Sequence, residues 1–162
     1  MTTLFIGLGR HETAFADENG VTHIAPIGSD TLASMIAGDP PLPEELTNAI
    51  GLFVDHLDDV AREVPAALIA DLVEVRGPGL QTFVDVFVGQ SRALPFDLDR
   101  DSSEEVFRAL ATESVAERRH NPGLVADEVH HILGVCCAIV AIHRGLQVSD
   151  LTVAGNPGSV TP

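Results

Sequence analysis

The sequence contains no lysine. Its basic residues other than histidine are nine arginines, which stand against 24 aspartates and glutamates, so the formal net charge of the 162 residues is −15 at pH 7. Proteins bind nucleic acids and anionic membrane surfaces mainly through cationic patches, and this charge therefore predicts neither kind of partner. Phosphate-bearing ligands would be repelled too, unless a local cluster of cations, Arg10-His11 or Arg118-Arg119-His120, outweighed the overall field.

Cysteine and long apolar runs are also scarce. The only two cysteines, Cys136 and Cys137, are adjacent in an apolar stretch. Neighbouring residues of a helix point in different directions, so we expect free thiols and a reducing compartment. No apolar run reaches the roughly 18 to 20 residues that span a bilayer, and the N-terminus lacks a basic segment followed by a cleavage site. Together these absences predict a cytoplasmic protein.

What is present is the composition of one globular domain, with 45% hydrophobic and 20% charged residues. We expect a single domain over residues 1–155 and a flexible tail over 156–162, where glycine and proline gather. A hairpin is indicated by Asn19-Gly20, which lies between two apolar runs. Gly145 is placed to cap the last helix. The hydrophobic patterns predict strands at about 4–8, 13–16, 21–27, 69–75 and 151–153, an irregular or edge segment at 94–96, and helices at about 31–36, 43–64, 80–88, 101–110 and 126–144.

This order of elements predicts an α/β fold that corresponds to one lobe of the actin-like ATPase, or ribonuclease-H-like, architecture. We expect a mixed central sheet of about five strands with helices on both faces. The sequence also resembles the C-terminal lobe of the exopolyphosphatase and guanosine-pentaphosphate phosphatase (Ppx/GppA) family over nearly its whole length. The resemblance is carried by the order and spacing of three stretches, LFIGLGRHETAF at 4–15, IAGDPPLPEEL at 36–46, and SVAERRHNPGLVADEVHHILGVCCAIVAIHRGLQVSDLTV at 114–153.

The resemblance implies that a phosphate loop follows the first strand, where the family pattern is hydrophobic-Asp-Ile-Gly-Gly-Gly-Ser-Thr-Glu. In such loops backbone N–H groups approach phosphate oxygens, and the aspartate serves a divalent cation. This sequence departs from the pattern, because Phe5 stands at the aspartate and Leu8 at the middle glycine. The candidate ligand-binding positions that remain in this loop are Gly7, Gly9, Arg10, His11 and Glu12, of which Arg10 and His11 replace the serine and threonine.

A second phosphate loop is implied after the central strand, and it is altered as well. Arg76, Gly77 and Pro78 stand where Gly-Gly-Thr is expected, so proline removes a backbone donor and the hydroxyl is lost. Arg76 and Gly77 complete the set of candidate ligand-binding residues. The N-terminal lobe, which in the family carries the other phosphate loop and the catalytic glutamate, has no counterpart in these residues. We therefore assign no catalytic residue, no metal and no cofactor.

Two features of the last predicted helix leave alternatives open. Glu128 and His131 are three residues apart and could share a metal ion if Cys136 or Cys137 supplied a further ligand, although a packed histidine is the simpler interpretation. The stretch 132–142 is hydrophobic nearly all round, so both of its sides must be covered. Either the sheet of the same domain or a second chain could cover them.

Three functional hypotheses follow. The first is a non-catalytic relative of the phosphatase lobe that acts as a regulatory or interaction module, as a homo-oligomer or with a separate partner chain. The second is one half of a split exopolyphosphatase or pppGpp phosphohydrolase. The third is a binder of a small anionic molecule, in which Arg10 and Arg76 pair with a ligand carboxylate or phosphate.

Overall fold

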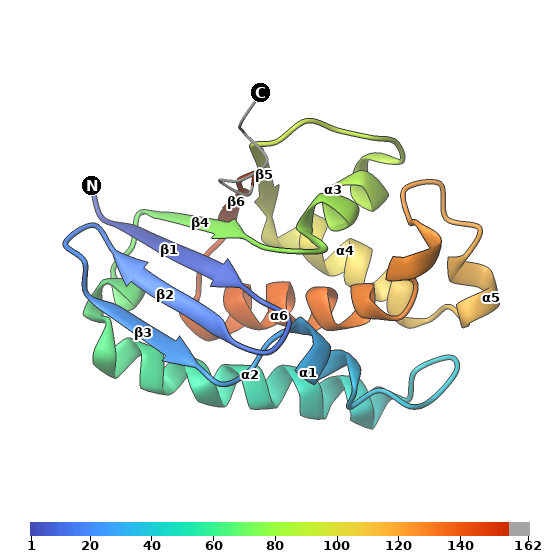
Figure 1. Cartoon of the computed structure of the whole chain (residues 1–162), viewed down its shortest axis with the longest axis horizontal. Helices are drawn as coiled ribbons and strands as arrows, with labels where there is room; N and C mark the ends of the chain where they lie inside the picture. Colours follow the sequence, from blue (N-terminus) through green and yellow to red (C-terminus); the bar gives the residue numbers. More distant parts are fainter. Residues whose placement is uncertain (156–162) are drawn as a thin grey trace.

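The computed structural model describes residues 1–155, and the tail predicted at 156–162 lies outside the described residues. The core of the fold is a mixed six-stranded sheet of order β3-β2-β1-β4-β6-β5 (Figure 1). Strands β1 to β3 form an antiparallel meander, β1, β4 and β6 are parallel, and β5 pairs antiparallel with β6. The strands are β1 (Thr3–Leu8), β2 (Thr13–Asp17), β3 (Thr22–Ala25), β4 (Leu72–Arg76), β5 (Phe96–Asp99) and β6 (Asp150–Val153).

The sheet has one strand more than the five that the sequence predicts. The additional strand is β5, which begins at Phe96, directly after Pro95, and lies at the edge of the sheet. An edge position tolerates a neighbouring proline because one side of the strand has no ladder to complete. The segment at 94–96, expected to be irregular or an edge, therefore leads into an edge strand.

Six α-helices and two short 3₁₀ helices connect the strands in the described part of the chain. The long helix α2 has Pro43 in its first turn, where a missing N–H costs nothing, and Glu45 accepts N–H bonds from Ala37, Gly38 and Leu42. None of the helices in residues 1–155 is both long and apolar enough to cross a membrane. The helices are α1 (Ser29–Ala33), α2 (Pro43–Glu63), α3 (Leu80–Val88), α4 (Arg100–Ala111), α5 (Val115–Arg118) and α6 (His131–Leu146), with η1 (Pro65–Leu68) and η2 (Ala126–Glu128).

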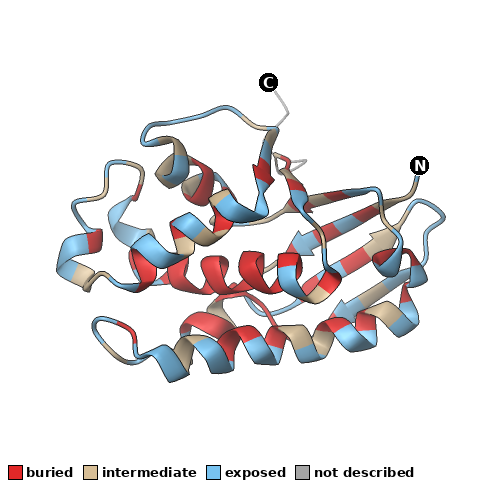
Figure 2. Ribbon diagram, turned by 180° about the vertical axis from the view of Figure 1, so that it is seen from behind, coloured by how far each residue is buried: buried red, intermediate tan, exposed pale blue. Residues whose placement is uncertain are grey.

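Helix α6 is the centre of the hydrophobic core. Every residue of α6 except Arg144 and Gly145 is buried, and the helix packs against α1, α2 and α4 (Figure 2). At Gly134 the approach to α1 is so close that a Cβ would lie 1.9 Å from the carbonyl oxygen of Ser29. The helix is thus covered by its own lobe, and the alternative that a second chain covers it is not needed.

The helix ends two residues later than predicted, at Leu146 rather than Arg144. Gly145 lies inside α6, where a Cβ would lie 2.6 Å from Cδ1 of Leu57, so this glycine permits close packing on α2. The left-handed position after the helix is taken by Gln147, with φ of 53°. The prediction that Gly145 caps the helix is therefore wrong, because packing rather than backbone freedom explains that glycine.

One face of the sheet is open. Burial alternates along the strands, so that Leu4, Ile6 and Leu8 are buried while Phe5 between them is 38% exposed. Seen from behind, the helices lie in front of the sheet (Figure 2), and α3 lies beyond the end of β4 (Figure 1). For residues 1–155, the expectation of helices on both faces is wrong, since the side chains on the other face remain exposed or half-buried. The open face carries Phe5, Ala14, Ala16, Ile24, Leu72, Glu74 and Arg76.

Candidate functional site

The two loops singled out by the sequence lie next to each other. They follow β1 and β4, which are parallel neighbours, and residues Gly7 and Arg76 are paired across the two strands. The approach is close, because a Cβ on Gly77 would lie 2.0 Å from the carbonyl oxygen of Leu8, and Gly77 has a φ of 149°. Only glycine fits this position. The fold thus places the predicted loops where a phosphate-binding edge would be expected, at the carboxyl ends of parallel strands.

The backbone of the first loop is bonded within the protein. The N–H of Gly9 donates to the carbonyl of Glu12 at 3.0 Å, closing a tight turn. The carbonyls of Gly9 and Arg10 accept the N–H groups of Ser29 and Asp30 at 3.0 and 2.8 Å, which fastens the loop to the start of α1. A phosphate loop needs N–H groups directed at its ligand. Here the N–H of Gly9 is bonded within the turn and is not directed at a ligand.

Arg10 is held by two carboxylates of the same chain. Its Nη1 lies 3.2 Å from Oδ1 of Asp30, and its Nη2 lies 3.8 Å from Oε1 of Glu128. His11, which is 81% exposed, has its Nε2 4.0 Å from Oδ2 of Asp30. Arg10 and His11, which the sequence predicts to bind an anion, therefore face carboxylates of the same chain.

His131 links the same carboxylates to α1. Its Nδ1 lies 2.6 Å from Oε2 of Glu128, and its Nε2 lies 2.7 Å from Oγ of Ser29 and 3.4 Å from Oδ1 of Asp30. Because a carboxylate only accepts, Nδ1 donates to Glu128, and in the neutral imidazole Nε2 then accepts the hydroxyl proton of Ser29. The order serine, histidine, carboxylate is that of a hydrolase triad, but Ser29 is fully buried and no substrate reaches it. The three side chains therefore connect α1, η2 and α6.

The structure supplies no further ligand for a metal ion shared by Glu128 and His131. Glu128 and His131 bond each other, and the thiols of Cys136 and Cys137 are buried among apolar side chains. Burial raises the pKa of Cys137 to about 12. Across residues 1–155, no group of three or more metal-ligating side chains converges.

Arg76 and Arg10 do not share a partner. On the open face of the sheet, Nε of Arg76 donates to Oε1 of Glu74 at 3.1 Å, and its Nη1 donates to the carbonyl of Gly155 at 2.9 Å. The structure thus brings Gly7, Gly9, Arg10, His11, Glu12 and Gly77 to one edge of the sheet, while the side chain of Arg76 is engaged elsewhere.

The second basic cluster is largely structural. Arg118 is buried, and its guanidinium donates to the carbonyl oxygens of Leu110, Glu113 and Val129. It closes the turn that leads into α6, so this arginine is not available to a ligand. Arg119 and His120 are exposed.

Asp30 and Ser29 are the site residues that sequence reasoning missed. Asp30 was interpretable only as part of the start of a helix, and Ser29 is 102 residues from His131. The spacing of Glu128 and His131 was a usable signal, for which a packed histidine was the simpler interpretation and a shared metal ion the alternative, and the structure shows a hydrogen-bonded pair.

Comparison with known proteins identifies the fold. No family model matches the chain, and no curated protein matches it by sequence. The crystal structure of an exopolyphosphatase-like protein superimposes with a TM-score of 0.84 at 14% identity, covering 96% of this chain and 55% of that one. The Ppx/GppA phosphatase of Aquifex aeolicus gives 0.81 at 16% identity, covering 95% and 53%. An exopolyphosphatase of Cytophaga hutchinsonii gives 0.70 at 14% identity, covering 94% and 53%.

The chain spans about half the length of these structures. At this level of identity the comparison establishes the architecture, a single actin-like ATPase lobe, and not the activity. The chain therefore has the fold of one lobe of the Ppx/GppA structures, as its sequence predicts.

Proposed function

We propose that the protein is a non-catalytic relative of a Ppx/GppA phosphatase lobe that acts as a regulatory or interaction module. The observation that carries this proposal is the pairing of Arg10 with Asp30 and Glu128. These carboxylates form ion pairs with the guanidinium of Arg10, as the oxygens of a bound phosphate would. A phosphoryl group entering here would have to displace them and would meet two like charges at short range.

Two further properties support the absence of catalysis. Phosphoryl transfer depends on clamping the transferred group with donors aimed at it, and the N–H of Gly9 is already bonded to the carbonyl of Glu12. In addition, the side chain of Phe5 lies on the open face and offers no oxygen to a divalent cation. The proposal therefore predicts no phosphate release from polyphosphate or pppGpp by the chain alone.

The open face of the sheet is the surface that we assign to interaction, with a second copy of the chain as the partner. Three large apolar side chains are exposed on it, Phe5, Ile24 and Leu72, with exposed fractions of 38%, 57% and 37%. Apolar side chains gathered on one flat face favour association. Because each copy carries a net charge of −15, association is expected to strengthen with salt, as the Debye length falls from about 10 Å at 0.1 M to about 3 Å at 1 M.

Size-exclusion chromatography with light scattering tests this assignment at low and high ionic strength. We expect a mass of two chains rather than the 17.1 kDa monomer, and a shift to monomer in Ile24→Glu. The matched control is Leu52→Glu, which places the same charge on α2 at a side chain that is 36% exposed. A clean monomer under all conditions, or equal loss of association in both variants, would contradict the assignment.

The split-hydrolase hypothesis draws on one observation, that the chain covers about half of the Ppx/GppA structures. Its test is phosphate release by this chain mixed with a separately expressed N-terminal lobe of such a phosphatase. Turnover that requires both chains and is lost on replacing Gly9 would favour it over a non-catalytic role.

A further inference from the structure

The two edges of the sheet are the strands β3 and β5 (Figure 1). An edge strand has backbone N–H and C=O groups on its outer side, and these can pair with a strand of another chain. Natural proteins discourage such pairing with charged side chains or proline at the edge. The two edges of this sheet differ in that protection, and the difference indicates where a partner strand would be accepted.

At β3, the hydrogen bonds to β2 determine which backbone groups face outward. The N–H of Asp17 donates to the carbonyl of Val21 at 3.0 Å. Bonded pairs recur at every second residue of an antiparallel ladder, so the backbone groups of His23 also face β2. Thr22 and Ile24 therefore direct their N–H and C=O groups outward. Both residues are exposed, and within residues 1–155 β3 pairs with β2 and with no other strand.

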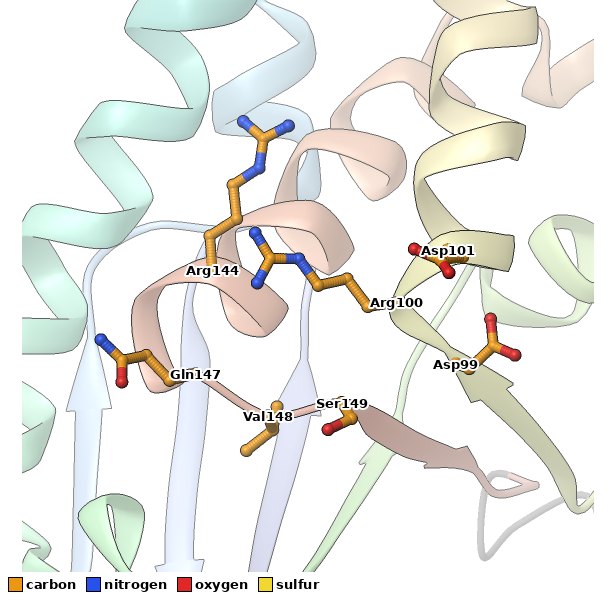
Figure 3. Close-up of a pocket in the computed structure, with 7 residues that line it drawn as sticks. All are labelled: Asp99, Arg100, Asp101, Arg144, Gln147, Val148 and Ser149. Carbon is orange, nitrogen blue, oxygen red and sulfur yellow. The ribbon is translucent and has the colours of Figure 1, made fainter.

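The edge at β5 is protected by charge. The N–H of Arg100 donates to the carbonyl of Ser149 at 2.7 Å, which makes these two residues a bonded pair across β5 and β6. By the same alternation Asp97 and Asp99 direct their backbone groups outward, and both have exposed carboxylates. Figure 3 shows Asp99 and Asp101 close together where β5 passes into α4. A second copy of this chain would therefore meet negative charge at this edge.

The edge at β3 has no such protection. Residues 19–29, which include all of β3, contain no aspartate, glutamate, lysine or arginine. The strand itself contains no proline, and Pro26 follows only after its last residue. Because each chain has a net charge of −15, a second copy approaches at the lowest electrostatic cost where the contacting segments are uncharged. Two copies of β3 meet that condition from both sides.

A two-fold axis at His23 would let two copies of β3 satisfy each other. In that antiparallel arrangement Thr22 lies opposite Ile24 of the second copy, and the reverse pair is equivalent. Each of these is a bonded pair, which exchanges two N–H···O=C bonds, so all outward backbone groups of the two residues gain a partner. The two copies of His23 form the non-bonded pair on the axis, with about 4.5 Å between their Cα atoms. The edge is thus complementary to itself.

The charges on the open face favour this edge contact over stacking of two open faces. Arg76 and Glu74 form an ion pair on β4, near the middle of the sheet, and their side chains are 38% and 18% exposed. Stacking would remove this pair from water, and the cost of desolvation can exceed the attraction between the two charges. Edge pairing leaves both charges hydrated and brings the Ile24 side chains of the two copies into diagonal contact on the same face.

We propose that two copies of the chain pair antiparallel along β3, about an axis at His23, and form one continuous sheet with six strands from each copy. This inference rests on the proposed function, in which a second copy is the partner at the open face, and it specifies how that copy is held. The backbone groups of Thr22 and Ile24 supply the hydrogen bonds, and the two open faces become one surface.

Thr22→Pro tests the backbone bonds. Proline removes an N–H that faces outward and leaves the ladder to β2 intact, and the first residue of an edge strand tolerates it. Size-exclusion chromatography with light scattering over a dilution series should show a dimer dissociation constant raised by about tenfold or more, because two inter-chain bonds are lost. Thr22→Val, which keeps the N–H and the branched shape, is the matched control. Asp97→Pro makes the same change at β5, and both controls should associate like the natural sequence.

Cysteine variants test the position of the axis without altering the backbone. Under oxidation by diamide, His23→Cys should form a disulfide-linked dimer, because the Cα separation of a non-bonded pair lies within the range for a disulfide. Thr22→Cys is the control, since its two copies are offset by two residues from direct opposition and lie too far apart to be bridged. Cys136 and Cys137 are buried, which keeps them from the oxidant.

The outcomes separate this inference from the proposed function. A dimer that keeps its affinity in Thr22→Pro, or that cross-links no better through His23→Cys than through Thr22→Cys, would overturn the edge pairing and leave a second copy as the partner. A natural sequence that is monomeric under all conditions would overturn both.

Discussion

Arg10 and Asp30 form an ion pair, 3.2 Å between Nη1 and Oδ1, at the point where the Ppx/GppA pattern has its phosphate-binding loop. The backbone reinforces the pair, because the N–H of Asp30 donates to the carbonyl of Arg10. Glu128 approaches the same guanidinium from the segment before α6. Two carboxylates from parts of the chain that are remote in sequence thus converge on one arginine.

Removal of the two carboxylate charges should make Arg10 available to an external anion. In the double variant Asp30→Asn/Glu128→Gln, we expect weak binding of tripolyphosphate that the natural sequence lacks. Asp55→Asn/Asp58→Asn changes the net charge equally on the exposed side of α2 and should not bind. Calorimetry with tripolyphosphate measures all three proteins, and equal binding by the natural sequence and both variants would contradict the role of the ion pairs.

The hydrogen bond between Ser29 and His131 should contribute to stability. Ser29→Ala removes a buried bond and leaves Nε2 of His131 without that donor, which costs about 1–2 kcal/mol of unfolding free energy. Ser34→Ala removes an exposed hydroxyl from the end of the same helix and should cost less than about 0.5 kcal/mol. Urea denaturation measures the unfolding free energy of both variants. Similar decreases in Ser29→Ala and Ser34→Ala would contradict a stabilising role of the buried Ser29 hydrogen bond.

His143 should make stability dependent on pH. Burial lowers the pKa of its imidazole, which donates from Nδ1 to the carbonyl of Val148 and accepts at Nε2 from Ser103. The folded state therefore holds the neutral form. Its stabilising contribution is complete above the unfolded pKa of about 6.5 and is lost as the pH falls below that value toward the lower folded pKa.

Urea denaturation between pH 8 and pH 5, in about one-unit steps, measures this effect. As the pH is lowered from 8 to 5, the unfolding free energy of the natural sequence should decrease, and that of His143→Phe should decrease less. His56→Phe is the control, because His56 lies on the surface helix α2 and is only partly buried. Parallel curves for the natural sequence and His143→Phe would contradict the assignment.

Gln147 should be replaceable by glycine with a gain in stability. It is exposed and adopts a left-handed conformation with φ of 53°, which favours glycine. We expect Gln147→Gly to raise the unfolding free energy by about 0.5–1 kcal/mol. Gln90→Gly, at an exposed position without positive φ, should not stabilise the protein. Thermal unfolding provides the comparison, and stabilisation by both or by neither would count against the explanation.

Much of the fold could be predicted because local patterns agree with it. The spacing of Ile50, Phe53, Leu57 and Val60 produces one apolar stripe, and that stripe is the buried side of α2. The one-sided sheet was not predicted, although the alternation of Glu74 with Val73 and Val75 is typical of a strand with one exposed face.

The candidate site was predicted only in part, for a physical reason. Backbone requirements are local, so the tight turn at Gly9 and the close approach at Gly77 correspond to glycines that the sequence displays. The charge pairing is not local, because Asp30 and Glu128 reach Arg10 only after the chain has folded. For that reason an arginine that appeared ready to bind a ligand proved to be neutralised from within.

Release of inorganic phosphate tests the central claim most directly. The purified chain, at high concentration with Mg²⁺, is incubated with polyphosphate or pppGpp, and free phosphate is measured against a buffer control. We predict no release above the control for the natural sequence. Turnover that scales with the concentration of this chain and disappears in Arg10→Ala would contradict the account, because it would mean that the altered loop still performs phosphate chemistry.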